Sequence, residues 1–268
     1  MKIQPKKSLG QNFLKNEGVL QKITDAGELS LSDTVLEVGP GEGALTEKLL
    51  KKGCGVIAVE KDCRLISILK EKFVKEISIG KLKVFEGDVL EDSVEKWGIG
   101  NGKFKIIANI PYYITGQFLR KFLSGKIKPT KMVILVQKEI ADRIMAKSGK
   151  ESLLSISVKA YGEPRIITKV SKGSFVPIPK VDSAVILIDN ISSRRFTDVR
   201  INEERFFDIL KIGFAHKRKV LISNLRDYFE KNGKNISEVF SNLNLFQKVR
   251  AEDLKLEDWG RLSLSLQR

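Results

Sequence analysis

Short apolar runs alternate along the first half of the chain with segments in which apolar residues recur every three or four positions. The runs are rich in β-branched residues and predict buried strands, whereas the spacing of the other segments predicts helices. The predicted strands cover 34–38, 55–60, 81–85, 104–108 and 132–136, and the predicted helices cover 17–29, 44–51, 62–76 and 138–146. Strands that alternate with helices predict an α/β fold with a doubly wound, largely parallel sheet.

The rest of the pattern divides the chain into two domains. Residues 152–161 have helical spacing, and 165–170 and 184–188 predict two further strands that pair antiparallel at the edge of the sheet. From Glu203 onward the apolar positions follow helical spacing alone. We therefore expect an α/β domain over 1–190 with a basic N-terminal arm over 1–18, a polar linker over 191–201 and a small all-α domain over 202–268.

Composition is that of a globular protein and excludes some chemistries. Of the 268 residues, 42% are hydrophobic and 30% are charged, and no apolar run reaches the length of a membrane span. The N-terminus lacks the apolar core of a secretory signal, so we expect a cytoplasmic protein without a membrane partner. The chain has only two cysteines, Cys54 and Cys63, and one histidine, His216, so no metal site is expected.

The formal net charge of +15 bears on partners rather than on fold. It is explained either by a lysine-rich proteome or by a polyanionic partner such as nucleic acid. In the C-terminal domain, the basic residues Lys217, Arg218, Lys219 and Arg226 are predicted to lie along one helix. Such a helix face either contacts a phosphate backbone or is a solvated surface.

Candidate ligand-binding residues stand at the ends of the predicted strands. Gly39 and Gly41 belong to a glycine loop between a strand and a helix, where the backbone can approach a ligand closely. Glu60, Asp88 and Asn109 stand at the ends of later strands. The carboxyl ends of parallel strands form the ligand-binding edge of such sheets, and an acid there can bind the hydroxyls of a ribose. Each residue alone also fits a turn, a solvated acid, a helix cap or a strand end, but together they predict a nucleotide site.

The segment Asn109-Ile110-Pro111-Tyr112 indicates a chemical role for this edge. The Asn109 amide oxygen and the Ile110 carbonyl both accept hydrogen bonds, and Pro111 has no N–H to compete for them. The Tyr112 ring offers a flat face on which a base can stack. Two acceptors beside an aromatic ring suit the exocyclic amine of a purine, whose lone pair becomes more nucleophilic when both hydrogens are held out of the ring plane. The alternative is a strand that ends in a proline turn, with Tyr112 as packing.

A second proline-containing segment runs from Ser174 to Ser183. Its two prolines, separated by one residue, predict an extended and rigid loop that can hold Phe175 in place. Phe175 then either faces the site or anchors the loop in the core.

Taken together, these motifs resemble the KsgA-type rRNA adenine N6,N6-dimethyltransferase family over nearly the whole chain. The resemblance rests on LGQNFL at 9–14, EVGPGEGALT at 37–46, Glu60, GDV at 87–89, NIPYYIT at 109–115, SFVPIPKVDSAV at 174–185 and GF…KRK…L…NL at 213–225. It implies a class I, Rossmann-like methyltransferase domain that uses S-adenosylmethionine, and a C-terminal helical domain that docks RNA. The implied reaction is methyl transfer to N6 of adenine in small-subunit ribosomal RNA, giving N6,N6-dimethyladenosine, with a role in small-subunit biogenesis.

The resemblance also implies residue roles. The implied cofactor contacts are Asn12, Leu14, Gly39, Gly41, Glu60, Asp88 and Asn109, and the implied catalytic residues are Asn109, Ile110, Pro111, Tyr112 and Phe175. Glu60 would bind the ribose and Asp88 the adenine amine of the cofactor. The arm would close over the site through Gln11, Asn12 and Phe13, and the flipped target base would stack on Tyr112 and Phe175. The implied RNA contacts are Lys217, Arg218, Lys219 and Arg226.

Departures from the family pattern concern the substrate side. Gly116-Gln117 stands where a small residue and a proline are common, residues 147–153 lack a usual Tyr-Gly pair, and His216 to Lys219 replace the more usual Arg-Arg-Lys. The expected partner is small-subunit rRNA or the precursor subunit, bound by a monomer. Two alternatives remain open: methylation of large-subunit rRNA of the macrolide-resistance type, and a non-catalytic nucleic-acid-binding factor on the same scaffold.

Overall fold

The computed structural model describes residues 4–6, 9–100 and 104–267, so parts of the predicted arm (1–3 and 7–8) lie outside the described residues. The chain separates into two compact units. The first comprises Met1–Ala141 and Glu163–Ile191, and the second comprises Asp142–Gly162 and Ser192–Arg268. The sequence pattern had assigned 142–162 to the first domain. In the structure this segment groups with the C-terminal helices, because the Tyr161 ring stacks on Phe207 with centroids 5.7 Å apart.

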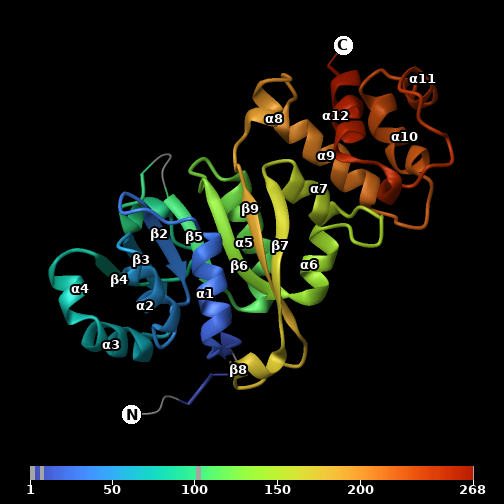
Figure 1. The fold of residues 1–268 in the computed structure, drawn as a ribbon. Helices are drawn as coiled ribbons and strands as arrows, with labels where there is room; N and C mark the ends of the chain where they lie inside the picture. Colours follow the sequence, from blue (N-terminus) through green and yellow to red (C-terminus); the bar gives the residue numbers. More distant parts are fainter. Residues whose placement is uncertain (1–3, 7–8, 101–103, 268) are drawn as a thin grey trace. The chain divides into compact units, whose positions relative to one another are not determined.

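The first unit is built on a seven-stranded sheet with the order β4-β3-β2-β5-β6-β9-β7 (Figure 1). The strands are β2 (Thr34–Val38), β3 (Gly55–Glu60), β4 (Leu82–Glu86), β5 (Phe104–Asn109), β6 (Lys131–Gln137), β7 (Glu163–Val170) and β9 (Ser183–Asp189). Strands β2 to β6 pair in parallel, whereas β9 pairs antiparallel with both β6 and β7. The predicted α/β fold is confirmed. The antiparallel strand, β9, is the second strand from the edge of the sheet, and β7 is the edge strand.

Helices bury apolar residues against both faces of this sheet. On one side, α1 (Glu17–Ala26), α2 (Ala44–Lys51) and α3 (Cys63–Lys72) contribute residues to one core cluster with alternate residues of the strands. On the opposite side lies α5 (Thr115–Ser124), a helix that the sequence analysis did not predict (Figure 1). The predicted helix 62–76 is divided, because Phe73 leaves helical geometry with φ −116° and ψ 35° and α4 (Val74–Ser78) begins after it. Helix α6 (Lys138–Ile144) ends two residues earlier than predicted.

A second, two-stranded sheet ties the arm to the proline-containing loop. In it, β1 (Phe13–Leu14) pairs antiparallel with β8 (Phe175–Val176), so that Phe13 is opposite Val176 and Leu14 is opposite Phe175. The backbone N–H of Lys15 continues the contact by donating to the Ser174 carbonyl at 2.8 Å. Strands of two residues carry no detectable periodicity, which is why the sequence did not predict them.

The second unit is helical. Its helices are α7 (Leu153–Lys159), α8 (Arg194–Thr197), α9 (Glu203–Phe214), α10 (Leu221–Lys231), α11 (Ile236–Asn242) and α12 (Leu256–Ser265). Helix α8 falls within the predicted linker, and it forms there because Phe196 is buried against Phe206 with ring centroids 5.4 Å apart. Among the described residues, no helix combines the length and the apolar character needed to cross a membrane.

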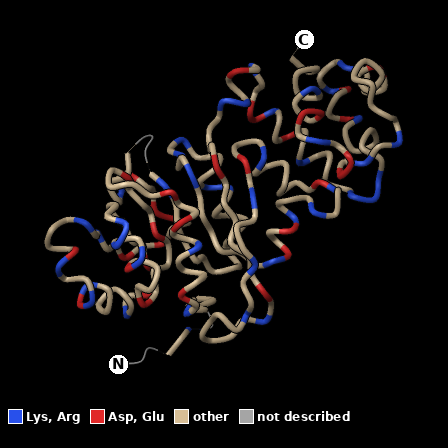
Figure 2. The backbone as a smooth tube through the Cα atoms, in the orientation of Figure 1, with Lys and Arg blue, Asp and Glu red and all other residues tan. Residues whose placement is uncertain are grey.

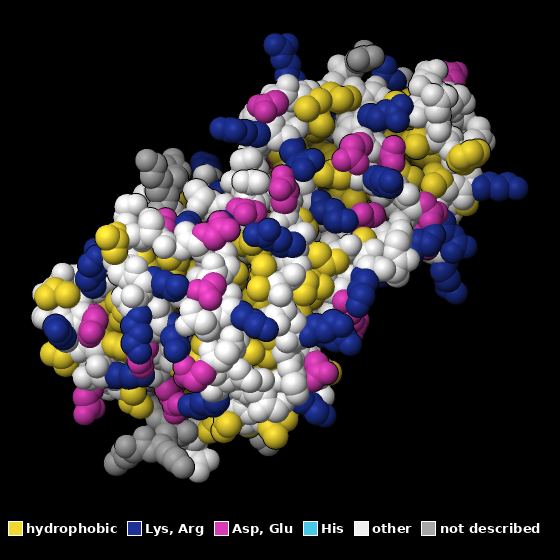
Figure 3. Space-filling model, viewed as in Figure 1, with side chains coloured by type: hydrophobic (Ala, Val, Ile, Leu, Met, Phe, Trp, Pro, Cys, Tyr) yellow, Lys and Arg dark blue, Asp and Glu magenta, His cyan; other side chains and the backbone are white. Residues whose placement is uncertain are grey.

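The predicted basic helix face is wrong in part. Lys217, Arg218 and Lys219 lie in the exposed turn between α9 and α10, and only Arg226 lies on a helix. The turn is closed by the Asn224 amide, whose Nδ2 donates to the Gly213 carbonyl at 2.7 Å. Basic residues occur along both units (Figure 2), and on the face in Figure 3 they are interspersed with acidic ones rather than gathered in one patch.

Candidate active site

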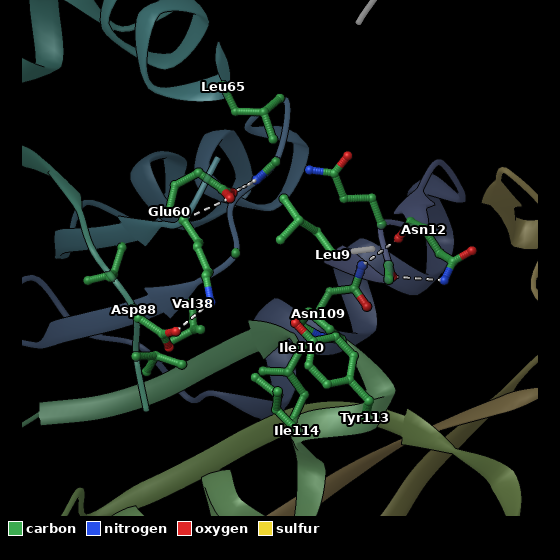
Figure 4. A pocket seen from close by; sticks show the side chains of 18 of the residues that line it. Leu9, Asn12, Val38, Glu60, Leu65, Asp88, Asn109, Ile110, Tyr113 and Ile114 are labelled. Carbon is green, nitrogen blue, oxygen red and sulfur yellow. Dashed lines mark hydrogen bonds and ion pairs between the residues drawn. The ribbon is translucent and has the colours of Figure 1, made fainter. Parts of the chain in front are cut away.

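A cavity lies at the carboxyl edge of the sheet in the first unit, next to the point between β2 and β5 where the strand order reverses. It is lined by residues 9–13 of the arm, Gly39 and Gly41 of the glycine loop, Glu60 and Lys61, residues 87–90 and residues 109–114. Figure 4 shows Glu60 and Asp88 on one side of the cavity and Asn109 with Ile110 on the other. Most predicted site residues are therefore brought together.

Glu60, the last residue of β3, is held by backbone donors. The Gly41 N–H donates to its Oε2 at 3.1 Å, and the N–H groups of Lys61 and Asp62 donate to its Oε1, each at 2.9 Å. Burial raises the pKa of Glu60, and these donors oppose the rise. A carboxylate has about four acceptor positions, so Oε2 retains capacity for a ligand hydroxyl.

Asp88 follows β4 and forms an ion pair with Lys61, with Nζ 2.6 Å from Oδ2. The Leu90 N–H donates to the other carboxyl oxygen at 2.9 Å. Burial alone would raise the pKa of Asp88, but Lys61 and the Leu90 donor outweigh it and hold the pKa below its usual value. Lys61 was not among the predicted site residues, and the only signal for it in the sequence is its position directly after Glu60.

The glycine loop and the arm pack closely over the cavity. Gly41 has φ +60°, and a Cβ at this position would lie 2.9 Å from the Phe13 ring. A side chain here is therefore excluded both by the backbone conformation and by the space. An ion pair between Lys15 and Glu42 also joins the arm to this loop.

The arm also sets the orientation of the Asn109 amide. Its Nδ2 donates to the backbone carbonyl of Asn12 at 3.1 Å (Figure 4). Because a carbonyl can only accept, the amide nitrogen must face the arm, which leaves Oδ1 available as an acceptor. The arm is held in turn by Gln11, whose Nε2 donates to Asp62 at 2.9 Å. Hydrogen bonds from Arg64 keep the pKa of Asp62 well below its usual value, so this anchor stays ionised.

Two adjacent tyrosines line the cavity after Pro111. The half-buried Tyr112 has its hydroxyl 2.6 Å from Ser183 Oγ, and burial raises the pKa of Tyr112. Tyr113 is 63% exposed, and its ring lies so close to Gly10 that a Cβ there would be 3.2 Å from the ring. Tyr113 was not among the predicted site residues, and the only signal for it in the sequence is its place beside Tyr112.

Two predicted site residues do not line the cavity. Leu14 is 4% exposed and Phe175 is 1% exposed, because their pairing across β1 and β8 directs both side chains into the core. Phe175 thus has the position of the loop anchor, the alternative that its sequence context left open. The predicted RNA contacts Lys217, Arg218, Lys219 and Arg226 belong to the second unit.

The lining fits S-adenosylmethionine. Two carboxylates, Glu60 and Asp88, face the cavity and complement a cationic ligand, and Glu60 keeps an acceptor for ribose hydroxyls. Gly39, which follows β2 and lines the cavity, has φ +66°, a conformation that glycine adopts without strain. Within the described parts of the chain, no group of three His, Cys, Asp or Glu residues is arranged to hold a metal ion.

Comparisons with known proteins agree with this geometry. The family model of ribosomal RNA adenine dimethylase matches residues 3–268. A ribosomal RNA small subunit methyltransferase A from Dehalococcoides mccartyi is 40% identical over 262 residues, covering 98% of this chain and 88% of the relative. The enzyme of the same name from Alkaliphilus oremlandii is 37% identical over 268 residues, covering 97% and 91%.

Solved structures show the same fold. A dimethyladenosine transferase from Plasmodium falciparum has a TM-score of 0.81 and 29% identity, covering 95% of this chain and 97% of the other. The 23S rRNA methyltransferase ErmE, at 23% identity and a TM-score of 0.73, covers 96% of this chain and 100% of its own, and shares the fold. The chain belongs to the ribosomal RNA adenine dimethylase family of S-adenosylmethionine-dependent methyltransferases.

Proposed function

We propose that this protein transfers methyl groups from S-adenosylmethionine to N6 of adenine in small-subunit ribosomal RNA, giving N6,N6-dimethyladenosine during subunit biogenesis. The observation that carries the proposal is one cavity with Glu60 and Asp88 on one side and Asn109 and Ile110 on the other, with Tyr112 also in its lining (Figure 4). The names of the relatives that match nearly the whole chain, small subunit methyltransferases, support the choice of RNA.

On the cofactor side, Glu60 accepts hydrogen bonds from the ribose hydroxyls and Asp88 accepts one from the adenine amine. Gly39 and Gly41 let the ligand approach the backbone closely. Two residues of the arm act indirectly. The Asn12 carbonyl accepts a hydrogen bond from the Asn109 amide, and Leu14 anchors β1 in the core. When bound, the cofactor supplies an electrophilic methyl group on a sulfonium.

On the target side, the Asn109 Oδ1 and the Ile110 carbonyl accept the two hydrogens of the adenine N6. Pro111 keeps this backbone rigid, and the Tyr112 ring stacks on the flipped base. Catalysis then rests on the position of the N6 lone pair, which must point at the methyl group, and the proton of N6 leaves to water. Phe175 supports this arrangement indirectly, because it anchors the arm that orients Asn109.

The proposed partner is small-subunit rRNA, as naked RNA or within a precursor subunit, and the protein acts on it as a monomer in the cytoplasm. In the second unit, the exposed turn with Lys217, Arg218 and Lys219, together with Arg226 on α10, contacts the phosphate backbone.

The test is transfer of tritium from labelled S-adenosylmethionine to under-methylated small and large ribosomal subunits, followed by digestion to nucleosides. We expect labelled N6,N6-dimethyladenosine from the small subunit alone. Label only in the large subunit would establish the macrolide-resistance type of activity instead. No label from either, by a folded protein that binds RNA but not the cofactor in calorimetry, would establish a non-catalytic binding factor.

A further inference from the structure

Resting on the proposed function, we propose that Ser183 is a positioning residue for methyl transfer, and that it acts by fixing the ring of Tyr112. Ser183 does not line the cavity, so it does not touch the substrate itself. Its hydroxyl lies 2.6 Å from the Tyr112 hydroxyl, a normal distance for a hydrogen bond between two hydroxyls.

The serine is the rigid partner in this pair. Ser183 is the first residue of β9, where its backbone is opposite Gln137 of β6 and Val170 of β7. Its side chain has 0% exposure. A residue held between two strands and fully buried cannot follow a moving ring, so it sets the place of any group that binds it.

The tyrosine is the partner that needs to be held. Tyr112 lies outside the sheet, at the start of a short 3₁₀ turn, Tyr112–Ile114. Its backbone is anchored by Thr115, whose hydroxyl donates to the Tyr112 carbonyl at 2.9 Å. The Ser183 contact anchors the opposite end of the side chain, at the tip of the ring. With both ends fixed, the long axis of the ring, which runs from Cβ to the hydroxyl, has a set direction in the cavity before a base stacks on it.

This arrangement links the ring to the reacting nitrogen. A base stacked on Tyr112 takes its tilt from the ring, and the tilt decides whether N6 meets the acceptors on Asn109 and Ile110. Near-attack geometry is sensitive to small displacements, so a ring whose tip is free to move lowers the rate more than it lowers binding. Burial raises the pKa of Tyr112, which keeps its hydroxyl protonated and able to donate throughout the neutral range.

A double-mutant cycle tests the inference. Ser183→Ala, Tyr112→Phe and the double variant are compared in single-turnover methyl transfer to under-methylated small subunits at saturating cofactor. We expect each single variant to lower the rate about five- to tenfold, the worth of one hydrogen bond. The double variant should be no slower than either single one, and cofactor affinity by calorimetry should be unchanged in all three.

Controls separate positioning from general damage to the fold. Ser263→Ala, at a buried serine whose hydroxyl has no partner, should retain the wild-type rate. Ser183→Thr keeps the hydroxyl in a strand that favours β-branched residues, so it should recover most of the rate. If Ser183→Ala does not fold, Tyr112→Phe and Ser183→Thr still carry the test.

Two outcomes would overturn the inference. One is a wild-type rate in Tyr112→Phe. The other is a set of losses that multiply in the double variant, so that the effect of Ser183→Ala persists unchanged when Tyr112 is already Phe. Absence of transfer by the wild-type protein on any ribosomal RNA is a different result, which overturns the proposed function and the inference with it.

Discussion

The two sides of the cavity are built from different chemistry. The side formed by β3 and β4 presents two carboxylates, Glu60 and Asp88, each held by backbone N–H groups or by Lys61. The side that follows β5 presents a neutral amide, a carbonyl and an aromatic ring, at Asn109, Ile110 and Tyr112. The first side suits a cationic ligand that also carries hydroxyl and amine donors. The second suits a neutral base with an exocyclic amine.

The supports of the two sides also differ. The carboxylates are fixed from within their own side of the cavity, by donors a few residues away, by the glycine loop and by Lys61, which follows Glu60 directly. The target side depends on distant segments, because Asn109 bonds to the arm and Tyr112 to β9. Disturbing the first side should therefore change affinity for the cofactor, whereas disturbing the second should change the rate of transfer.

The largest effect is expected from Asn109→Ala. The change deletes one of the two proposed acceptors for the target N6, and misplacement of the reacting nitrogen costs about 10²-fold in rate. We expect a loss of this size in single-turnover transfer at saturating cofactor. Asn190→Ala, at an exposed asparagine after β9, is the matched control and should transfer normally. A near-normal rate in Asn109→Ala would remove the positioning account of the target side.

Glu60→Ala should act on the carboxylate side of the cavity and change the affinity for the cofactor. A hydrogen bond to a charged acceptor is worth about 1.5–3 kcal/mol, so the Kd for S-adenosylmethionine should rise about 10- to 100-fold. Isothermal titration calorimetry measures this directly. Glu86→Ala is the control, because Glu86 pairs in register with Glu60 on the next strand but is exposed and does not line the cavity. Unchanged affinity in Glu60→Ala would exclude that residue from the cofactor site.

A smaller effect is expected in the second unit, where the proposed contacts are with the RNA backbone rather than with a base. Replacing Lys217, Arg218 and Lys219 by alanine removes three exposed charges from one turn. Each phosphate contact contributes about 0.7–0.9 to the salt slope, so the slope of log affinity against log salt should fall by about 2. Alanine at the exposed Lys231 and Lys248 is the control. An unaltered slope would make the turn a solvated surface.

The smallest effect on activity, but a clear one on stability, is expected from Glu37→Gln beneath the glycine loop. Glu37 is 1% exposed and neither carboxyl oxygen has a hydrogen-bond partner. Burial raises the pKa of Glu37 from 4.5 to about 8. Thr46 opposes this rise, although its distance and angle to the carboxyl group do not make a hydrogen bond. The negative charge of Glu60 adds to the rise. The folded state therefore binds this proton more tightly than the unfolded state does.

The sign of the pH dependence follows. Between the unfolded pKa near 4.5 and the folded pKa near 8, ionisation favours the unfolded state, so this group lowers stability as pH rises. Glutamine cannot ionise, so the free energy of unfolding of Glu37→Gln relative to wild type should grow from pH 5 to pH 8, by about 3–4 kcal/mol. Urea titrations at several pH values measure the difference. A difference that does not vary with pH contradicts a protonated Glu37.

The sequence predicted the elements that have clear periodicity, and therefore the sheet edge with Gly39, Glu60, Asp88 and Asn109. It failed where the outcome depends on contacts between distant segments. The pairing of β1 with β8 decided that Phe175 points into the core, and two-residue strands leave no pattern to detect. The helical spacing on both sides of Lys217, Arg218 and Lys219 predicted one helix through these residues. In the structure they lie in a turn that the Asn224 side chain closes.

The most direct test of the central claim is the nucleoside product of a single turnover. Wild-type protein and Asn109→Ala, both saturated with labelled S-adenosylmethionine, are mixed with under-methylated small subunits, and the RNA is digested. The account predicts labelled N6-methylated adenosine from the wild type, which becomes N6,N6-dimethyladenosine with further turnover, and about a hundredfold less from Asn109→Ala. Label in any other nucleoside, or equal rates from the two proteins, would contradict it.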